Sequence, residues 1–372
     1  MRLLSLSCEN FRNLSQVTVT PSPRATIAVG ENGQGKTNLL EALYYLATLK
    51  PLRANTLKEL VQFTQGRARV QGRWLLSGAE RDIAVEVSHG TRTAFVDGKR
   101  AASLEAYFGG VSVVAFTPDD LSIVKGGPEG RRAFLDRSVF NRFPAYLQES
   151  REYTKALKSR NRLLKEQAPH AHLQVWDETL ARMGARLWVR RRALVNEVSP
   201  RAQVAFGRIG RIEAPATFLY EPSHLTMPFQ TASEAELQTA LAQALDARLA
   251  RDFERGHTSV GPHVDDLELS LGEHAARQYA SQGQSRALVI AWKVAEIENL
   301  AATNGFLPML LLDDVSSELD PERNAFLMQY LADSGAQTLL TTTDAQLVRR
   351  AAGSETTWLS VKAGTVTPMD AG

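Results

Sequence analysis

Eight consecutive residues of this chain have the spacing of a phosphate-binding P-loop. They fit G-x-x-x-x-G-K-[ST], a pattern in which glycines let the backbone curl until successive N–H groups point at one phosphate cluster. The lysine can reach the β- and γ-phosphates as a mobile point charge, and the threonine hydroxyl can bind Mg²⁺. The residues predicted to bind the nucleotide here are Gly30, Glu31, Asn32, Gly33, Gln34, Gly35, Lys36 and Thr37.

The segments on either side of this loop suit the same site. Residues 25–29 are apolar and partly β-branched, which predicts a short buried strand. Residues 38–49 place leucines and a tyrosine at helical spacing. A strand, a glycine-rich loop and a helix in this order aim the helix N-terminus at an anion. The alternative is a glycine-rich turn that holds an incidental lysine.

A pair of acids comes much later in the chain, where an apolar run over residues 307–312 ends in Asp313 and Asp314. Such a run predicts a buried strand that delivers acids at its carboxyl end, which is where α/β sites form. We expect Asp313 to hold Mg²⁺ through water and Asp314 to orient the attacking water, so the predicted catalytic residues are Lys36, Asp313 and Asp314. The alternative is an exposed acidic turn after a strand.

A second anion site is predicted upstream of these acids. Ser281 and Gly283 begin a segment with an apolar helical face, and serine and glycine at a helix N-terminus can bind an anion. Because the P-loop already serves one set of phosphates, a second site suggests a second ATP molecule and therefore a second subunit. The alternative is that Ser281 is an ordinary N-cap.

Hydroxyl side chains end another predicted strand, over residues 338–344. A polar side chain at that place can sense a γ-phosphate. The alternative is that these threonines serve β-propensity and a helix cap.

Size and composition bound the class of protein. The 372 residues are enough for two domains and a large core. Hydrophobic residues make up 44% and charged residues 23%, which is ordinary for a globular protein, and the net charge of +2 does not by itself indicate nucleic acid. Cys8 is the single cysteine, so no internal disulfide can form. The N-terminus reads as a strand and not as a signal peptide, and no apolar run could span a bilayer, so we expect a cytoplasmic protein without a membrane partner.

The pattern of residues changes along the chain. Residues 1–116 are rich in predicted strands, with a hairpin turn at Asp97-Gly98. Residues 129–198 predict helices, with one over about 144–167, a break at Pro169, and a second over about 173–198. We expect a strand over 207–227 and then a helix over 233–255 that opens with a Ser233–Glu236 capping box.

Basic residues are dense in the two central predicted helices. Spacings of four residues place several cations on one helical face, with few acids near them in the sequence. A charge run is usually a solvated face, and the functional alternative is a stripe that follows the DNA phosphates without reading sequence. The DNA-binding candidates are Arg151, Lys155, Lys158, Arg162, Arg182, Arg186 and Arg190.

Taken together and in this order, these segments resemble the heads of ABC-type ATPases. Residues 281–284 resemble the signature motif, and residues 317–320 resemble the D-loop, which adds Asp320. Residues 9–14 are similar to the start of the SMC-like DNA-repair ATPases. More narrowly, segments 117–121, 125–136 and 261–266 resemble the bacterial recombination mediators within that group, and the resemblance runs from Met1 to about Asp344.

The resemblance implies an α/β fold in which both ends of the chain build the ATPase head. Residues 1–117 and 256–372 would form a mixed sheet with a P-loop core and an antiparallel β subdomain, and residues 118–255 would form an inserted, mainly helical arm. It implies ATP and Mg²⁺ as cofactors, with Thr37 and Asp313 on the metal. The further nucleotide contacts that it implies are Arg12, Asn38, Ser281, Gly283, Gln284 and Asp320.

The same resemblance implies a function. ATP would clamp two heads into a homodimer, with Ser281 and Gly283 of one copy at the γ-phosphate of the other, and slow, DNA-stimulated hydrolysis would release them. The partners would be DNA at single-strand gaps, double-stranded DNA, RecO and RecR, and the outcome would be RecA loading in gap repair.

Three departures separate the chain from transporter ATPases. Asp314 stands where those enzymes usually carry glutamate, Thr342 or Thr343 stands near the place of their switch histidine, and no Q-loop glutamine follows Phe116. These departures, the long insertion and the basic helices argue against a transporter subunit. An SMC tether would need hundreds of heptad residues, and a small-molecule kinase would not explain the signature or D-loop segments.

Overall fold

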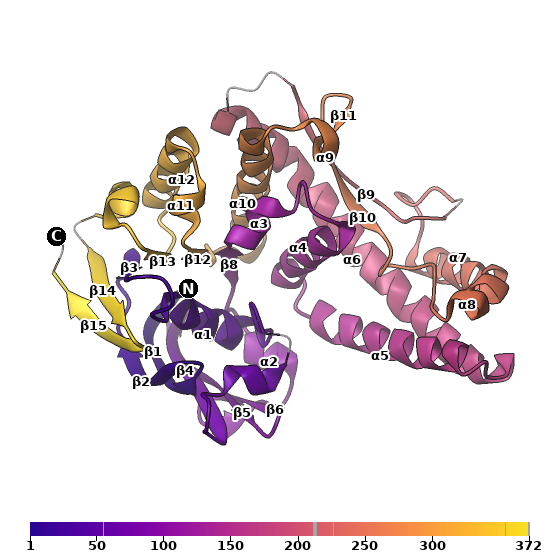
Figure 1. The fold of residues 1–372 in the computed structure, drawn as a ribbon, viewed down its shortest axis with the longest axis horizontal. Helices are drawn as coiled ribbons and strands as arrows, with labels where there is room; N and C mark the ends of the chain where they lie inside the picture. Colours follow the sequence, from indigo (N-terminus) through magenta and orange to yellow (C-terminus); the bar gives the residue numbers. More distant parts are fainter. Residues whose placement is uncertain (55, 211–213, 226, 354, 371–372) are drawn as a thin grey trace. The chain divides into compact units, whose positions relative to one another are not determined.

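The computed structural model describes residues 1–54, 56–210, 214–225, 227–353 and 355–370 (Figure 1). Two compact units make up the chain. The head unit comprises Met1–Leu121 and Lys293–Gly372, and the arm unit comprises Ser122–Trp292.

A six-stranded sheet forms the centre of the head unit, in the order β15-β14-β3-β13-β12-β8 (Figure 1). All neighbours pair in parallel except β14 and β15, so the sheet is mixed. Every residue of β12 and β13 is buried, as expected for strands covered on both faces. The strands are β3 (Ala25–Val29), β8 (Val113–Phe116), β12 (Met309–Asp313), β13 (Thr338–Thr342), β14 (Thr356–Lys362) and β15 (Thr365–Met369).

The second sheet of the head unit is antiparallel, in the order β2-β1-β4-β5-β6-β7. Asp97 and Gly98 both have positive φ in the turn between β6 and β7, as the predicted hairpin requires. The side chain of buried Gln337, which immediately precedes β13, exchanges two hydrogen bonds with the backbone of Leu3 in β1 and so ties the two sheets together. The strands are β1 (Arg2–Phe11), β2 (Leu14–Val19), β4 (Arg67–Leu76), β5 (Ala79–Ser88), β6 (Thr91–Val96) and β7 (Lys99–Arg100).

Helix α1 (Lys36–Thr48) follows the P-loop and packs between these two sheets. The leucines, alanines and tyrosines of α1 are distributed around the whole circumference of the helix, and almost all of its residues are buried. A helix that is apolar all round belongs in a core, so its sequence already fits this position. The remaining short elements of the head unit are η1 (Leu57–Leu60), α2 (Leu104–Phe108), α3 (Pro118–Ser122), α11 (Val315–Glu318), α12 (Pro321–Ser334) and η2 (Ala345–Ala351).

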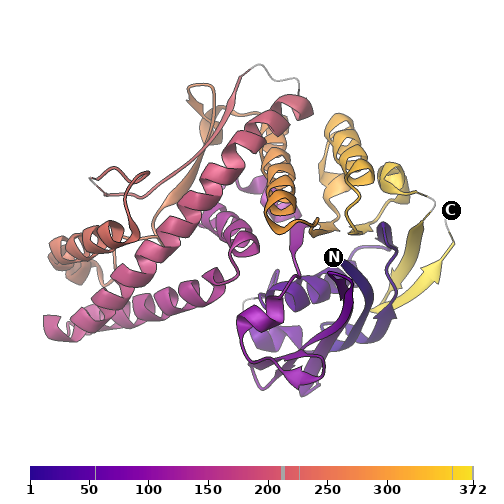
Figure 2. The ribbon, with the colours of Figure 1, turned by 180° about the vertical axis from the view of Figure 1, so that it is seen from behind.

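The arm unit is mainly helical and is built on a helical hairpin of α5 and α6 (Figure 2). A three-stranded antiparallel sheet, β11-β10-β9, completes it. Its elements are α4 (Pro128–Arg142), α5 (Tyr146–Lys165), α6 (His170–Gly210), β9 (Ala216–Glu221), α7 (Glu234–Ala247), α8 (Leu249–Arg255), β10 (Asp266–Leu271), β11 (His274–Ala275), α9 (Ala276–Tyr279) and the first part of α10 (Gln282–Asn304).

Three expectations about the arm need correction. Helix α6 does not end near Val198 but continues through Pro200 to Gly210. Proline removes one backbone hydrogen bond, but Pro200 is exposed, and buried Val198 and Ala202 on either side keep the helix packed. Of the strand predicted over 207–227, residues 207–210 belong to α6 and residues 216–221 form β9, while residues 211–213 and 226 lie outside the described residues. The helix predicted over 233–255 is two helices that meet at Arg248. The Ser233–Glu236 capping box is present.

Residues 256–292 belong to the arm unit, whereas the sequence assigned them to the head. The reason is long-range pairing. Strand β10 pairs with β9 along its length, and Trp292 donates a hydrogen bond to the Ser138 hydroxyl of α4. Among the described residues, no helix is both long and apolar enough to cross a membrane.

Candidate nucleotide site and the basic arm

The P-loop joins the end of β3 to the start of α1. Gly33 and Gly35 have positive φ, and Gly35 caps the helix in the left-handed conformation. A Cβ on Gly30 would lie 2.3 Å from the Val361 carbonyl oxygen, and one on Gly35 would lie 2.7 Å from the Asn13 side chain. Glycine is therefore required here for conformation and for space.

Lys36 folds back over its own loop. Its Nζ donates hydrogen bonds to the carbonyl oxygens of Gly30 (2.6 Å) and Glu31 (2.8 Å), and only 6% of the residue is exposed. Burial lowers the pKa of Lys36, while the carboxylates of Asp314 and Asp313 act in the opposite direction. The ammonium group thus lies on the P-loop with two acids near it.

Asp313 ends β12 and is the meeting point of the site. Its Oδ1 accepts hydrogen bonds from the hydroxyls of Thr37 (2.7 Å) and Thr341 (3.0 Å), and its Oδ2 pairs with Arg53 Nη2 at 2.6 Å. The P-loop threonine and this acid come from opposite ends of the sequence, and the strand order brings them together. The sequence predicted the pairing of Thr37 with Asp313 at a metal site but missed Arg53 and Thr341.

Asp314 follows in the left-handed conformation, with φ 49°. Its N–H donates to the carbonyl (3.1 Å) and the hydroxyl (3.0 Å) of Thr341, which fixes the turn. Its Oδ1 is buried without a hydrogen-bond partner. Burial raises the pKa of Asp314, and the charge of Lys36 lowers it. An orphaned carboxylate oxygen beside a phosphate-binding loop is suited to accept a hydrogen bond from water.

The other predicted nucleotide contacts of the head unit are held around α1. Arg12 Nε and Nη2 both lie 2.9 Å from Glu41 Oε2 on α1. Asn38 donates to the Asn13 side chain at 2.8 Å, and Asn13 donates to the Gln34 carbonyl at 3.2 Å, so a chain of two hydrogen bonds connects α1 to the P-loop backbone. The side chains of Glu31 and Asn32 are exposed.

Asp320 is the N-cap of α12. It accepts a hydrogen bond from the Arg323 N–H at 3.1 Å and pairs with Arg323 Nη1 at 2.7 Å. Burial tends to raise the pKa of Asp320, but its bonds to Arg323 outweigh burial and lower it. The structure therefore gives Asp320 a capping role in a single subunit.

Ser281, Gly283 and Gln284 lie in the arm unit, at the start of α10. Gln284 N–H donates to Ser281 Oγ at 3.1 Å, and Ser281 N–H donates to Gln284 Oε1 at 2.8 Å. This reciprocal pair is a capping box, which was the alternative to an anion site. The side chain of Ser281 is exposed, and that of Gln284 is partly exposed.

The threonines that end β13 differ in what they contact. Thr342 is buried, and its hydroxyl accepts from the Asp344 N–H at 3.1 Å and donates to the Asp344 carbonyl at 3.0 Å, so it serves the turn. Thr341, which the sequence did not single out, is the one that contacts Asp313. Alternation along the strand would have separated the two, because neighbouring side chains point to opposite faces.

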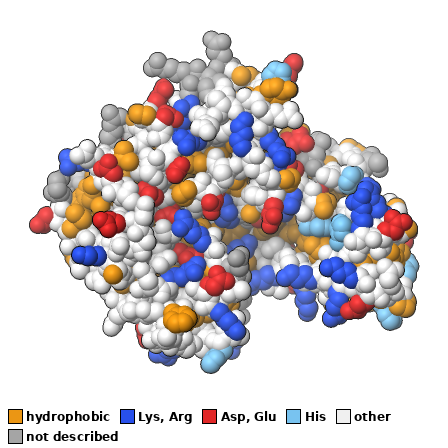
Figure 3. Space-filling model, in the orientation of Figure 1, with side chains coloured by type: hydrophobic (Ala, Val, Ile, Leu, Met, Phe, Trp, Pro, Cys, Tyr) orange, Lys and Arg blue, Asp and Glu red, His pale blue; other side chains and the backbone are white. Residues whose placement is uncertain are grey.

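The basic residues of the arm are more often paired than the sequence predicted. Acids from distant segments reach them: Arg186 pairs with Glu234 at 3.2 Å, and Arg190 with Glu149 at 3.3 Å. Arg162 lies 3.9 Å from Glu166 on its own helix. Among the described residues, four candidates have no ion pair, and we call them the open arm cations: Arg151, Lys155, Lys158 and Arg182. Figure 3 shows Lys and Arg side chains over the arm unit.

Several other arm cations are structural. Arg160 is fully buried and pairs with Asp177 at 2.5 Å and Asp252 at 2.7 Å. Arg191 is buried against Asp136, and its guanidinium also reaches the Pro262 carbonyl at 2.7 Å. Buried charges need such partners, so these arginines cannot contact DNA without unfolding the arm.

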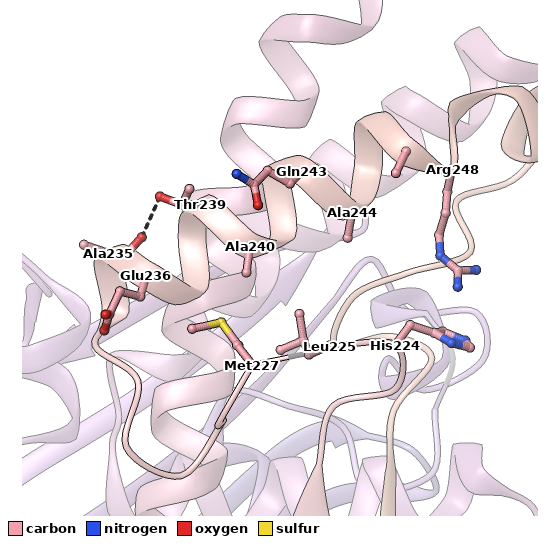
Figure 4. Close-up of a pocket in the computed structure, with 11 residues that line it drawn as sticks. His224, Leu225, Met227, Ala235, Glu236, Thr239, Ala240, Gln243, Ala244 and Arg248 are labelled. Carbon is pink, nitrogen blue, oxygen red and sulfur yellow. Dashed lines mark hydrogen bonds between the residues drawn. The ribbon is translucent and has the colours of Figure 1, made fainter.

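A cavity of about 670 Å³ lies in the arm unit beside α7 (Figure 4). Alanines of α7 face Leu225 and Met227 across it, and His224 and Arg248 stand at one end. None of the predicted site residues lines this cavity.

The fold and the P-loop site define the class of protein. A P-loop follows one parallel strand, acids end another strand of the same sheet, an antiparallel sheet covers the P-loop helix, and a helical arm is inserted. This arrangement is the head of an ABC-type ATPase, as the sequence predicted. Residues 2–366 match a family model described as RecF/RecN/SMC N terminal domain.

Comparisons with known proteins narrow the class. The chain is 66% identical over 368 residues to the DNA replication and repair protein RecF of Myxococcus xanthus, covering 98% of this chain and 97% of that one. It is 54% identical over 377 residues to the RecF protein of Anaeromyxobacter sp. strain K, covering 99% and 100%. A solved structure of the recombination mediator protein RecF–ATPrS in the RecFOR pathway matches with a TM-score of 0.88 and 30% identity, covering 99% and 98%. The chain belongs to the RecF family.

Proposed function

We propose that this protein is an ATP-dependent recombination mediator of gap repair. It binds DNA, dimerises on ATP, and promotes RecA loading together with RecO and RecR. The names of its relatives, which describe replication, repair and recombination mediation, support this proposal. The structural observation that carries it is the meeting of Thr37 and Asp313 beside Lys36.

ATP and Mg²⁺ fit the residues present. Thr37 Oγ1 and Asp313 Oδ1 are hard oxygen ligands that already lie 2.7 Å apart, and Mg²⁺ prefers such ligands. Gly33 and Gly35 give the loop the positive φ angles with which successive N–H groups can point at one phosphate cluster. Bound Mg²⁺ would supply charge compensation for the phosphates, and Lys36 would exchange its two carbonyl partners for phosphate oxygens.

Hydrolysis is proposed to be slow. Asp314 is the residue that orients the attacking water, because its buried Oδ1 has no partner in the protein. Its side chain is shorter than the glutamate of transporter ATPases, which fits a timed switch better than rapid turnover. Stimulation of this weak ATPase activity by DNA is part of the proposal.

Dimerisation is proposed to complete the site. Ser281, Gly283 and Gln284 of one copy would face the γ-phosphate held by Lys36 of a second copy, with Asp320 contributing through its D-loop position. Ser281 is exposed at the start of α10, so a second copy could reach its hydroxyl, which would then exchange the Gln284 N–H for a phosphate oxygen. DNA at single-strand gaps and double-stranded DNA would be held by the open arm cations and Arg162.

One experiment tests the proposal most directly: mass by light scattering and DNA binding by fluorescence anisotropy, each with and without ATP. Lys36→Met should abolish ATP binding. Ser281→Arg should spare ATP binding but prevent dimerisation and hydrolysis. Gln238→Arg, which adds the same charge at an exposed position of the arm, is the matched control. No ATP-dependent change in mass at concentrations well above micromolar would contradict the proposal, and so would normal hydrolysis by Ser281→Arg.

A further inference from the structure

Both oxygens of the Asp313 carboxylate are engaged. Two hydroxyls, from Thr37 and Thr341, occupy Oδ1, and the guanidinium of Arg53 occupies Oδ2 at 2.6 Å. The Asp313 side chain is 2% exposed, so water cannot replace these partners easily. A divalent cation at Asp313 would therefore compete with these partners, above all with the charge of Arg53 at Oδ2.

Arg53 is the partner built to leave. Its side chain is 45% exposed, so the guanidinium can turn into solvent without opening the core. Its backbone stays in place meanwhile, because the Arg53 N–H donates to Glu41 Oε1 at 3.0 Å and the Leu52 N–H donates to the same oxygen at 3.1 Å. The loop is thus anchored to α1 while the side chain is free to move.

The ion pair between Arg53 and Asp313 also affects the net charge of the site. Lys36 and Arg53 carry two positive charges, and Asp313 and Asp314 carry two negative ones, so the formal sum is zero. A divalent cation arriving alone would meet two cationic side chains in a site that has no net negative charge. A nucleotide that arrives with the cation brings its own phosphate charge.

We propose that Arg53 is the counter-ion that occupies the metal acid Asp313 until Mg²⁺ and nucleotide arrive together, and that it keeps free divalent cation out of the site. Arg53 is a positioning residue here, because it acts through Asp313. This inference rests on the proposed function, which assigns Asp313 to the metal.

A purely structural ion pair would behave differently. Exposed pairs contribute little to stability, and losing one would change the thermal midpoint slightly and leave metal affinity unchanged. Losing a counter-ion from a buried carboxylate leaves that carboxylate available to another cation. Metal affinity in the absence of nucleotide therefore separates the two roles.

The test measures the affinity of the nucleotide-free full chain for Mn²⁺. The electron paramagnetic resonance signal of free Mn²⁺ reports how much of the ion remains unbound. Arg53→Ala and Arg53→Gln should each bind Mn²⁺ about tenfold more tightly than the wild type, a change of about 1.4 kcal/mol. Arg73→Ala is the control, because Arg73 is an exposed arginine of the head unit paired with Asp82 at 3.5 Å. Adding Asp313→Asn to Arg53→Ala should remove the gain.

Unchanged Mn²⁺ affinity in both Arg53 variants would overturn the inference, as would a gain that survives Asp313→Asn. A separate measurement, Mn²⁺ binding in the presence of ATP, tests the metal role of Asp313 independently of Arg53. If the wild type with ATP binds Mn²⁺ and Asp313→Asn does not, the metal role of Asp313 stands whatever the Arg53 variants do. If Asp313→Asn binds Mn²⁺–ATP normally, the proposed metal site itself is wrong.

Discussion

Replacing Glu41 by alanine removes the carboxylate that organises one side of the nucleotide site. This side chain is 1% exposed and lies on α1, between the two sheets. Its Oε2 holds the guanidinium of Arg12 with Nε and Nη2 each 2.9 Å away, and its Oε1 accepts the N–H groups of Leu52 and Arg53. One substitution therefore releases Arg12 and the loop after α1 together.

The cost can be worked from these contacts. A hydrogen bond to a charged group contributes about 1.5–3 kcal/mol, so the simple sum would be large. It must be discounted, because 21% of the Arg12 side chain is already exposed and can be rehydrated, as can the loop N–H groups. We expect Glu41→Ala to reduce the free energy of unfolding by about 3 kcal/mol. For a unit of this size the thermal midpoint should fall by about 6–12 °C.

Thermal unfolding followed by circular dichroism measures this loss, and equilibrium binding of ATP measures its effect on the site. ATP affinity should also fall, because Arg12 and the loop that carries Arg53 lose their anchor. Glu80→Ala is the matched control, since Glu80 is an exposed carboxylate in the same unit. If Glu41→Ala unfolded within about 1 °C of the wild type, the burial and pairing assigned to Glu41 would be wrong.

Three further outcomes are expected. Burial lowers the pKa of His263 below its ordinary value of 6.5, so the neutral ring stabilises the arm above that pH, and this stability is lost as the pH falls below it. The loss should be at most about 1.4 kcal/mol per pH unit, visible in unfolding midpoints between about pH 7.5 and about pH 5.5 and absent in His263→Gln. Replacing the open arm cations by alanine should weaken DNA binding and flatten its dependence on the logarithm of salt concentration by about 0.9 for each DNA phosphate that the variant no longer neutralises. Arg186→Ala should change that slope little, because Arg186 is already paired with Glu234, and equal slopes for both variants would refute the assignment. Gly364→Ala should weaken ATP binding, because a Cβ there would lie 2.1 Å from the Asn13 carbonyl oxygen and φ is +78°, and unchanged binding by calorimetry would contradict this.

Local sequence patterns were sufficient for the P-loop half of the site. The backbone of the loop is determined by its own glycines, and the strand that ends in Asp313 is recognisable from its apolar run. The meeting of Thr37 with Asp313 needed only the rule that parallel strands end at one edge of a sheet. Arg53 gave no such signal, because an arginine in a loop has no period and its partner is far away in the sequence.

The arm shows the same limit more clearly. Counting acids along the sequence near Arg186 and Arg190 suggested an unpaired basic face, but Glu234 and Glu149 come from other helices. The boundary between the two units also depends on residues far apart in the sequence. Residues 256–292 belong to the arm because β10 pairs with β9. Propensity placed a helix end near Pro200, and packing on both sides of that residue carried the helix through it.

The enclosure of α1 between two sheets has a consequence for any probe that reports on solvent. Since almost no residue of this helix touches water, its amides should exchange with deuterium only when the whole head opens, in the free and the nucleotide-bound protein alike. The occupancy of the site would then be invisible in the helix nearest to it. It would be recorded instead in the two loops that flank α1, where Glu31, Asn32, Gly33 and Arg53 are exposed.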